Sequence, residues 1–274
     1  MVKAASPVRD ALDAAVTSLT AAGVDDPRLD ADVLLAAASG TSRAELYSEP
    51  ERPLDPAVAQ QFDEMVRRRT QREPVAYILE RAYFRQLELV VDDRVLIPRP
   101  ETELLVDLAQ NRQRVLDVGT GSGAIALAIA HEREGARVTG IDSSPDAVEV
   151  ARGNAERLGL EVEMMIADLI VGGPYDLIVS NPPYVRDAEW PGLPPEISLY
   201  EPQDAVLGGP DGLDVIRRLV PEAAQTLVRG GMLGMEVGQG QSRAVEAMFE
   251  KAGLRAVETT RDLAGIPRVV TGRR

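Results

Sequence analysis

The stretch Tyr175-Asp-Leu-Ile-Val-Ser-Asn-Pro-Pro-Tyr184 decides how the rest of the chain is interpreted. Residues 175–180 form a short apolar run with β-branched residues at its centre, which predicts a buried strand. Pro182 and Pro183 lack an N–H and end this strand abruptly, and Pro182 forces Asn181 into an extended conformation. We therefore expect a stiff corner at the carboxyl end of a strand, which is where open α/β sheets bind ligands.

The chemistry of this corner suits a planar group that carries an NH₂. The Asn181 side-chain oxygen and the Pro182 carbonyl oxygen can each accept one N–H, and the Tyr184 ring can cover the flat face of the group. Such an arrangement holds an amide or amino nitrogen; it offers no group that would cut a bond.

Composition limits the class of protein. The chain has 274 residues, of which 45% are hydrophobic, enough for one large domain or for one medium and one small domain. It contains no window of about 18 apolar residues, so no membrane span is expected. Residues 1–7 lack the apolar block of a secretory signal, and a cytoplasmic location is the simplest interpretation. The absence of cysteine excludes disulfides, thiolate zinc sites and a cysteine nucleophile.

Charge argues against a nucleic-acid substrate. The formal net charge is −14, and such a field repels a phosphate backbone. The cluster Arg67-Arg-Arg69 with Arg72 is an exception, and it has two interpretations: a solvated helix end, or a contact for an acidic or nucleic-acid partner. The only histidine, His131, is expected on the surface at a helix end, and no metal site is expected.

The first third of the chain predicts a small helical domain followed by a linker. Cap residues followed by proline or by helical periodicity open helices near Ser6, Asp26, Ser42 and Asp55, which together predict a bundle over residues 1–73. Alternating patterns at 75–79 and 84–91 predict a β-hairpin linker over residues 74–98. The main domain is expected over 99–274.

From residue 114 onward, strand and helix patterns alternate. Strands are expected at 115–118, 137–141, 161–166, 175–180, 232–237, 254–258 and 268–271, with helices at 101–110, 124–130, 144–159, 211–229 and 242–252. This alternation predicts an α/β fold with a doubly wound, mainly parallel sheet. Residues 185–210 are rich in proline and form a long irregular stretch, and such a loop is usually functional or disordered.

The run Gly119-Thr-Gly-Ser-Gly123 lies between a strand and a helix, where glycines let a ligand approach the backbone. Asp142 follows 19 residues beyond Gly123 at the end of the next strand, the place of a ribose-binding carboxylate. Nicotinamide cofactors and S-adenosylmethionine both contain a ribose that a carboxylate at this position can bind. Asp117 could pair with a cationic amino group. Asp168 could accept from the amino group of an adenine whose ring Leu169 covers, and both features favour S-adenosylmethionine. Helix capping is the alternative role for Asp117 and Asp168.

Several motifs together resemble one family. The sequence resembles the class I S-adenosylmethionine-dependent methyltransferases, and more closely the HemK/PrmC family of protein-(glutamine-N5) methyltransferases that modify peptide chain release factors. The resemblance covers nearly the whole chain and is carried by 96–103 (Leu-Ile-Pro-Arg-Pro-Glu-Thr-Glu), 117–127, Ser-Asn-Pro-Pro-Tyr at 180–184, Gly-Gly-Pro-Asp-Gly-Leu-Asp at 208–214, and Asp-Leu-Ala-Gly at 262–265. The Asn-Pro-Pro-Tyr motif also occurs in adenine-N6 methyltransferases, whereas the 96–103 block is much more specific. Glu80 departs from the pattern, because glycine is expected there.

The resemblance implies a seven-stranded class I methyltransferase sheet and assigns residues to roles. The residues implied to hold S-adenosylmethionine are Gly119, Thr120, Gly121, Ser122, Gly123, Asp142, Asp168, Leu169 and Asn181. Those implied to hold the glutamine of a Gly-Gly-Gln motif in class 1 release factors are Asn181, Pro182, Pro183 and Tyr184, with Asn181, Pro182 and Tyr184 as the catalytic group. S-adenosylhomocysteine is the implied product.

Some questions stay open at this point. The helical domain and the loop around Trp190 are expected to grip the protein substrate, although Trp190 could instead pack in the core. Arg99 and Glu101 have either a structural ion pair or a role at the site. The competing functions are an adenine-N6 methyltransferase acting on RNA or DNA, which the net charge opposes, and a non-catalytic binding module. No direct contact with nucleic acid or membrane is expected.

Overall fold

The structure, a computed structural model, describes residues 6–274 and divides the chain into two compact units. The helical unit comprises residues 6–80 together with Pro194–Tyr200, and the α/β unit comprises Arg81–Leu193 and Glu201–Arg274. The sequence boundary was expected near residue 73. The structure extends the helical unit to Glu80 and adds to it a segment from the long irregular stretch.

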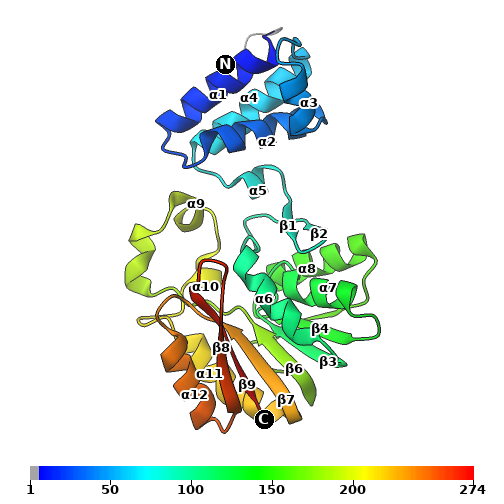
Figure 1. The fold of residues 1–274 in the computed structure, drawn as a ribbon, viewed down its shortest axis with the longest axis vertical. Helices are drawn as coiled ribbons and strands as arrows, with labels where there is room; N and C mark the ends of the chain where they lie inside the picture. Colours follow the sequence, from blue (N-terminus) through cyan, green and yellow to red (C-terminus); the bar gives the residue numbers. More distant parts are fainter. Residues whose placement is uncertain (1–5) are drawn as a thin grey trace. The chain divides into compact units, whose positions relative to one another are not determined.

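The helical unit has helices near the four predicted starts, but only Ser42 and Asp55 cap them through their side chains (Figure 1). Its helices are α1 (Val8–Ala21), α2 (Pro27–Ser39), α3 (Arg43–Ser48), α4 (Pro56–Thr70), α5 (Val75–Ile78) and α9 (Pro195–Ser198). The N-cap of α1 is Pro7 and not Ser6, and Asp26 at the start of α2 makes no side-chain cap hydrogen bond. Asp55 caps α4 by accepting from the Ala57 amide at 2.8 Å, and Ser42 forms a capping box with Glu45. Leu12, Leu34 and Phe62 lie fully buried where α1, α2 and α4 meet.

One predicted strand is wrong: residues 75–79 begin a short helix, α5, and not the first strand of a hairpin. The helix starts after Pro74, and Ile78 packs into the core of the helical unit, which a strand facing a hairpin partner could not do. The hairpin consists of β1 (Ala82–Phe84) and β2 (Leu87–Leu89). Glu80 has a φ of 52°, in the left-handed region that favours glycine, which agrees with the glycine expected there.

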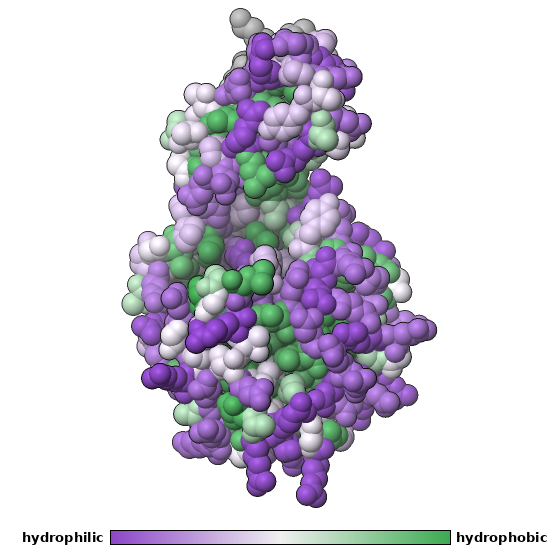
Figure 2. Space-filling model, in the orientation of Figure 1, coloured by the Kyte–Doolittle hydropathy of each residue, from purple (hydrophilic) through white to green (hydrophobic). Residues whose placement is uncertain are grey.

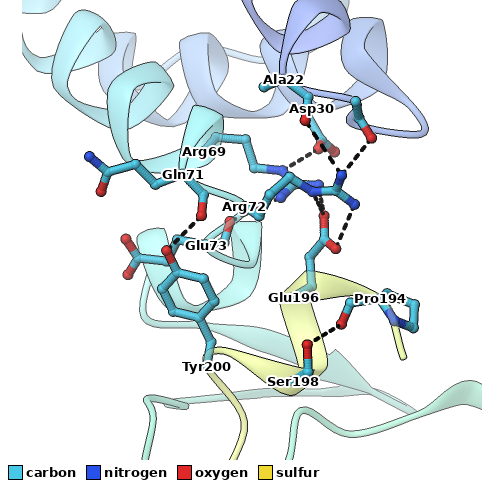
Figure 3. A network of polar contacts seen from close by, with 11 residues as sticks. Ala22, Asp30, Arg69, Gln71, Arg72, Glu73, Pro194, Glu196, Ser198 and Tyr200 are labelled. Carbon is cyan, nitrogen blue, oxygen red and sulfur yellow. Dashed lines mark hydrogen bonds and ion pairs between the residues drawn. The ribbon is translucent and has the colours of Figure 1, made fainter. Parts of the chain in front are cut away.

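Most of the arginine cluster differs from both of its interpretations, because carboxylates of the same unit pair with Arg68, Arg69 and Arg72. Arg69 is buried and pairs with Asp30 at 2.7 Å and with Glu196 at 2.8 Å. Arg72 binds both oxygens of Glu196, at 2.7 and 2.8 Å. Figure 3 shows these side chains converging from α2, the end of α4 and α9. Of the cluster, Arg67 is the member that fits a solvated helix end, since its side chain is 58% exposed.

The α/β unit contains a seven-stranded sheet in the order β5-β4-β3-β6-β7-β9-β8. Its strands are β3 (Arg114–Val118), β4 (Arg137–Asp142), β5 (Glu163–Ile166), β6 (Tyr175–Ser180), β7 (Leu227–Glu236), β8 (Arg255–Arg261) and β9 (Pro267–Arg273). Strands β3 to β7 pair in parallel, and β9 is antiparallel to both of its neighbours. The predicted fold class is therefore confirmed.

Two helical layers cover the sheet, and alternate residues of the strands point to opposite layers. Val115 packs on the side of α7 (Ala124–Glu132) and α8 (Pro145–Leu158), and Leu116 packs on the side of α11 (Asp214–Thr226) and α12 (Ser242–Lys251). Figure 1 shows the two helix pairs on either side of the strands.

The remaining elements are short. The helix expected at 101–110 is broken into η1 (Pro100–Thr102), α6 (Glu103–Val106) and η2 (Asp107–Ala109). The irregular stretch 185–210 holds η3 (Asp187–Gly192), α9 and α10 (Gln203–Val206). Hydrophilic side chains cover most of the face seen in Figure 2, as the charge of −14 requires. In the described part of the chain, no helix is long and apolar enough to cross a membrane.

Candidate active site

A cavity of about 420 Å³ opens at the carboxyl ends of the central strands of the α/β unit. The strand order reverses between β3 and β6, and ligands bind at such a switch point. The cavity brings together eight of the residues singled out from the sequence: Gly119, Gly121, Asp142, Asp168, Leu169, Asn181, Pro182 and Pro183. It does not include Thr120, Ser122, Gly123 or Tyr184, which lie beneath or beside it.

The glycine turn exposes bare backbone to this cavity. Gly121 has a φ of 54°, and a Cβ added there would meet nothing within 4 Å, so a side chain would occupy cavity space. Gly123 has a different reason to be glycine, since a Cβ there would lie 2.9 Å from the Leu127 side chain in α7. The turn therefore combines an open approach to the backbone with close packing of the following helix.

Asp142 is held rigidly at the end of β4. Its Oδ2 accepts from the Gly121 amide at 2.9 Å, and its Oδ1 accepts from the Ser144 amide at 3.0 Å. Each carboxylate oxygen has two lone pairs, so both can still accept from ligand hydroxyls. Its position in the cavity wall suits the ribose-binding role expected from the sequence.

Asp168 and Leu169 also line the cavity, after the end of β5. Asp168 is exposed, and one of its oxygens accepts from Arg218 at 2.7 Å, which leaves the other oxygen available. Leu169 has a φ of 116°, which is rare for a residue with a side chain and costs free energy. Such strain in a cavity wall is typical of residues that contact a ligand.

Asp117 takes the alternative role considered for it, helix capping. It is completely buried, and its Oδ2 accepts from the Thr120 hydroxyl at 2.7 Å and from the Ala126 amide at 3.2 Å. Its Oδ1 has no hydrogen-bond partner among the described residues. Burial raises the pKa of Asp117 to about 7, because these two donors compensate only part of the lost hydration.

The Asn181 corner presents two acceptors to the cavity. The Asn181 Nδ2 donates to the Thr102 hydroxyl at 3.1 Å, so its Oδ1 points away from Thr102. Within residues 6–274, no group donates to the Asn181 Oδ1 or to the Pro182 carbonyl oxygen. A ligand with two N–H groups would satisfy both atoms.

The backbone of the corner is supported from the second half of the chain. Gln241 is buried and donates through Nε2 to the Tyr184 carbonyl oxygen at 2.9 Å. A Cβ at Gly208 would lie 2.6 Å from the Pro183 carbonyl oxygen, and one at Gly212 would collide with the Tyr184 carbonyl oxygen. The glycines of 208–212 are therefore needed because the loop packs directly on the corner.

A buried carboxylate lies behind the corner. Glu236, the last residue of β7, accepts from the Thr102 hydroxyl at 2.6 Å and from the Tyr184 hydroxyl at 3.3 Å. Burial raises the pKa of Glu236 to about 7, and the nearby Glu101 adds to this rise, while the two hydroxyls and Arg268 oppose it. Burial likewise raises the pKa of the Tyr184 hydroxyl well above its usual value.

Two open questions from the sequence have answers in the structure. Arg99 forms an ion pair with Glu201 at 2.6 Å, and not with Glu101, which agrees with the interpretation as a structural ion pair. Trp190 is half-buried in η3 and does not belong to a hydrophobic core. His131 is exposed at the end of α7, as expected. The described residues include no cluster of side chains that could hold a metal ion.

Comparison with known proteins now adds to this geometry. Residues 10–79 match the family described as PrmC N-terminal domain, and residues 100–191 match the family described as methyltransferase small domain. A release factor glutamine methyltransferase of Caulobacter vibrioides is 41% identical over 94% of this chain and 93% of its own length. The chain belongs to the release factor glutamine methyltransferase family. Two further release factor glutamine methyltransferases agree with this assignment. The protein of Geobacter sulfurreducens is 42% identical over 97% of this chain and 96% of its own length. The protein of Salmonella typhimurium is 40% identical over 91% of this chain and 93% of its own length.

Solved structures place this methyltransferase in the same fold class. A Pyrococcus furiosus methyltransferase superposes with a TM-score of 0.52 at 19% identity, covering 68% of this chain and 88% of that one. A T. thermophilus 16S rRNA methyltransferase, solved with AdoMet and guanosine, gives a TM-score of 0.50 at 22% identity. The superposition covers 71% of this chain and 49% of that one. The family assignment and the fold together identify an S-adenosylmethionine-dependent methyltransferase.

The sequence reasoning missed the residues that support the corner, namely Thr102, Glu236 and Gln241. Thr102 lies inside a motif that carried the resemblance, but a threonine at the start of a helix has no signal that would mark it as a support for Asn181. Glu236 offered one: it is an acid at the end of an apolar strand, as are Asp142 and Asp168. The same rule that selected those two aspartates would have selected Glu236.

Proposed function

We propose that this methyltransferase transfers a methyl group to the side-chain amide nitrogen, N5, of the glutamine in the Gly-Gly-Gln motif of class 1 peptide chain release factors. The observation that carries the proposal is the pair of free acceptors, Asn181 Oδ1 and the Pro182 carbonyl oxygen, on one cavity wall. A primary amide has two N–H groups on one nitrogen, so the two acceptors match it. The relatives named for release factor glutamine methylation support the same substrate.

The residues of the cavity suit S-adenosylmethionine as the methyl donor. Gly119 and Gly121 offer bare backbone, Asp142 has lone pairs for ribose hydroxyls, and Asp168 with Leu169 forms a wall for an adenine ring. The volume of about 420 Å³ lies within the range of about 300–1,000 Å³ that is usual for ligand sites. When bound, this cofactor supplies an electrophilic methyl group on a sulfonium, and S-adenosylhomocysteine is the proposed product.

The role of the corner follows from the chemistry of an amide. An amide nitrogen is a weak nucleophile, because its lone pair is delocalised into the carbonyl. Acceptance of both N–H bonds by Asn181 and Pro182 raises electron density on the nitrogen and turns its lone pair toward the methyl group. Positioning and electrostatic stabilisation then provide most of the catalysis. The new N–C bond replaces the S–C bond, and the nitrogen, now acidic, loses one proton to water.

Substrate capture is proposed to involve the helical unit and the loop that carries Trp190. Trp190 is half-buried in η3, and the exposed part of its ring is suited to contact with a protein surface. We expect Trp190→Ala to raise the KM for a release factor about tenfold while leaving the affinity for the cofactor unchanged. Equal KM values in the variant and the wild type would remove Trp190 from this role. Since release factors act on the ribosome, the proposal places the reaction in the cytoplasm.

The deciding experiment measures methyl transfer from labelled S-adenosylmethionine. The substrates are a purified class 1 release factor, its variant with alanine in place of the Gly-Gly-Gln glutamine, and total RNA. Label on the unmodified factor alone is the expected result. Label on RNA alone would support the adenine-N6 alternative, and label on the alanine variant would move the target to another residue.

A further inference from the structure

Three side chains form a buried hydrogen-bond chain that ends at Asn181. Glu236 is completely buried at the end of β7, and Thr102 is buried in η1. The Thr102 hydroxyl donates to Glu236 Oε2 at 2.6 Å. The oxygen of this Thr102 hydroxyl also accepts from Asn181 Nδ2 at 3.1 Å. The hydrogen-bond chain therefore connects the buried Glu236 carboxylate, which does not line the cavity, to the Asn181 amide, which does.

The donor count of this chain fixes the orientation of the Asn181 amide. A hydroxyl has a single proton, and the Thr102 proton is used in the bond to Glu236. Toward Asn181, the Thr102 oxygen can therefore only accept, so the NH₂ end of the amide must face it. The two ends of an amide are nearly equal in shape, so this hydrogen-bond pattern is what keeps Oδ1 on the cavity side.

We propose that Glu236, acting through Thr102, is a positioning residue that keeps the Asn181 carbonyl oxygen directed at the substrate. The inference rests on the proposed function, because it assumes that Asn181 Oδ1 accepts an N–H of the substrate amide. Without the chain, the Asn181 amide can turn and present its NH₂ group, which repels the N–H groups of the substrate. The fraction of correctly oriented enzyme would then fall.

Protonation of Glu236 gives this proposal a measurable pH dependence. The groups that face Glu236 are the Tyr184 and Thr102 hydroxyls, with Glu101 and Arg268 acting on it through their charges. Burial raises the pKa of Glu236 to about 7. The protonated carboxyl can donate to Thr102, and Thr102 can then donate to Asn181 Oδ1. This reversed chain stabilises the turned amide, so activity is expected to fall as the pH drops below about 7.

The central test is a double-mutant cycle on kcat with a purified release factor and labelled S-adenosylmethionine. Thr102→Val removes the hydroxyl at nearly constant volume and is expected to lower kcat about 10- to 100-fold, with cofactor affinity by calorimetry unchanged within about twofold. Thr102→Ser restores the hydroxyl and should retain kcat within about threefold. Adding Thr102→Val to Asn181→Ala should change kcat by less than about threefold, because the residue to be positioned is already gone.

A matched control separates positioning from loss of a buried hydroxyl. Thr271 is also buried, in β9 of the same unit, and Thr271→Val tests the general cost of that change. If Thr102→Val and Thr271→Val have the same kcat, or if the effects of Thr102→Val and Asn181→Ala multiply, the inference is overturned. An unaffected Asn181→Ala variant would instead overturn the proposed function. If Thr102→Val folds poorly, the pH profile of Glu236→Gln decides, because that variant removes the titrating carboxyl while Thr102 stays in place.

The pH profile supplies the readout that a merely structural role would not move. Glu236→Gln cannot titrate, so the acid limb of kcat near pH 7 should disappear in this variant, with a lower plateau at pH 8. An acid limb that persists unchanged in Glu236→Gln would assign it to another group, such as Asp117, and would overturn the role of Glu236.

Discussion

Two glutamates, the half-buried Glu196 in the helical unit and the fully buried Glu236 in the α/β unit, show how differently carboxylates are used in this protein. Glu196 in the helical unit lies against two arginines, Arg69 and Arg72. Burial alone would raise the pKa of Glu196, but the hydrogen bonds from these arginines outweigh burial and lower it to about 2. Glu236 in the α/β unit accepts only from hydroxyls, and its pKa rises to about 7.

Burial disfavours the ionised form of both glutamates. The groups that donate hydrogen bonds to each carboxylate decide whether this loss of hydration is compensated. A guanidinium compensates a carboxylate in full, and the resulting cluster fastens the segment Pro194–Tyr200 to α2 and α4 (Figure 3). Two hydroxyls compensate it only in part. A carboxylate of the first kind stabilises a fold, whereas one of the second kind can orient a neighbour and respond to pH.

The largest effect on activity is expected at Asn181, the end of the hydrogen-bond chain that lines the cavity. Asn181→Ala should lower kcat about 10²- to 10³-fold, or about 3–4 kcal/mol, because an interaction that strengthens in the transition state is lost. Cofactor affinity, measured by calorimetry, and the thermal midpoint should change little. Equal losses in turnover and in cofactor affinity would mean that Asn181 serves binding and would weaken the contrast between the two regions.

The next effect concerns the charged cluster and should appear in stability. Arg69→Met removes the buried guanidinium that pairs with the half-buried carboxylates of Asp30 and Glu196, so the free energy of unfolding should fall by about 3 kcal/mol. Amide hydrogen exchange in α2 and α4 measures this loss. The neighbouring Arg67→Met is the control, because the pair of Arg67 with Glu64 is exposed and screened by water, so its loss should change stability far less. If the two variants lose equal stability, burial does not strengthen the cluster.

The pH dependence of stability should have opposite signs in the two regions. The pKa of Glu236 is about 7 in the folded state and about 4.3 in the unfolded chain, so the folded state binds more protons between these values. Its contribution is fully present below about pH 4.3 and is lost as the pH rises through about 7. Relative to Glu236→Gln, the wild type should lose about 2 kcal/mol between pH 5 and 8 in urea unfolding. A flat difference would show that Glu236 is as well compensated as Glu196.

The smallest effect is expected for Glu196→Gln. The folded pKa of Glu196 is about 2, so its contribution is present above the unfolded value of about 4.3 and is lost as the pH falls through about 2. Between pH 5 and 8 the variant should therefore be less stable than the wild type by a constant amount of about 1 kcal/mol. Glu64→Gln, at an exposed pair in the same unit, is the control and should change stability less. A difference that varies with pH in this window would contradict the low pKa.

Much of the fold and of the cavity wall could be predicted because the signals are local. Strand and helix periods in 114–274 predict the parallel sheet, and the carboxyl ends of its strands meet at one edge. Gly119 and Asn181 each follow a strand directly and Asp142 is the last residue of one, so their convergence follows from the topology alone. The prediction failed at 75–79, because alternation over five residues cannot distinguish a strand from a single helical turn.

What the sequence by itself determined is the order of elements, the switch point of the sheet and the chemistry of the Asn181 corner, since each depends on neighbouring residues. Only the tertiary structure decided which partners complete them. Thr102 and Glu236 lie 134 positions apart, and Arg72 and Glu196 lie 124 apart, yet each pair shares a hydrogen bond. A pKa depends on every group within a few ångströms, and the chain order does not contain that information. The opposite shifts of two glutamates therefore arise only when the chain is folded.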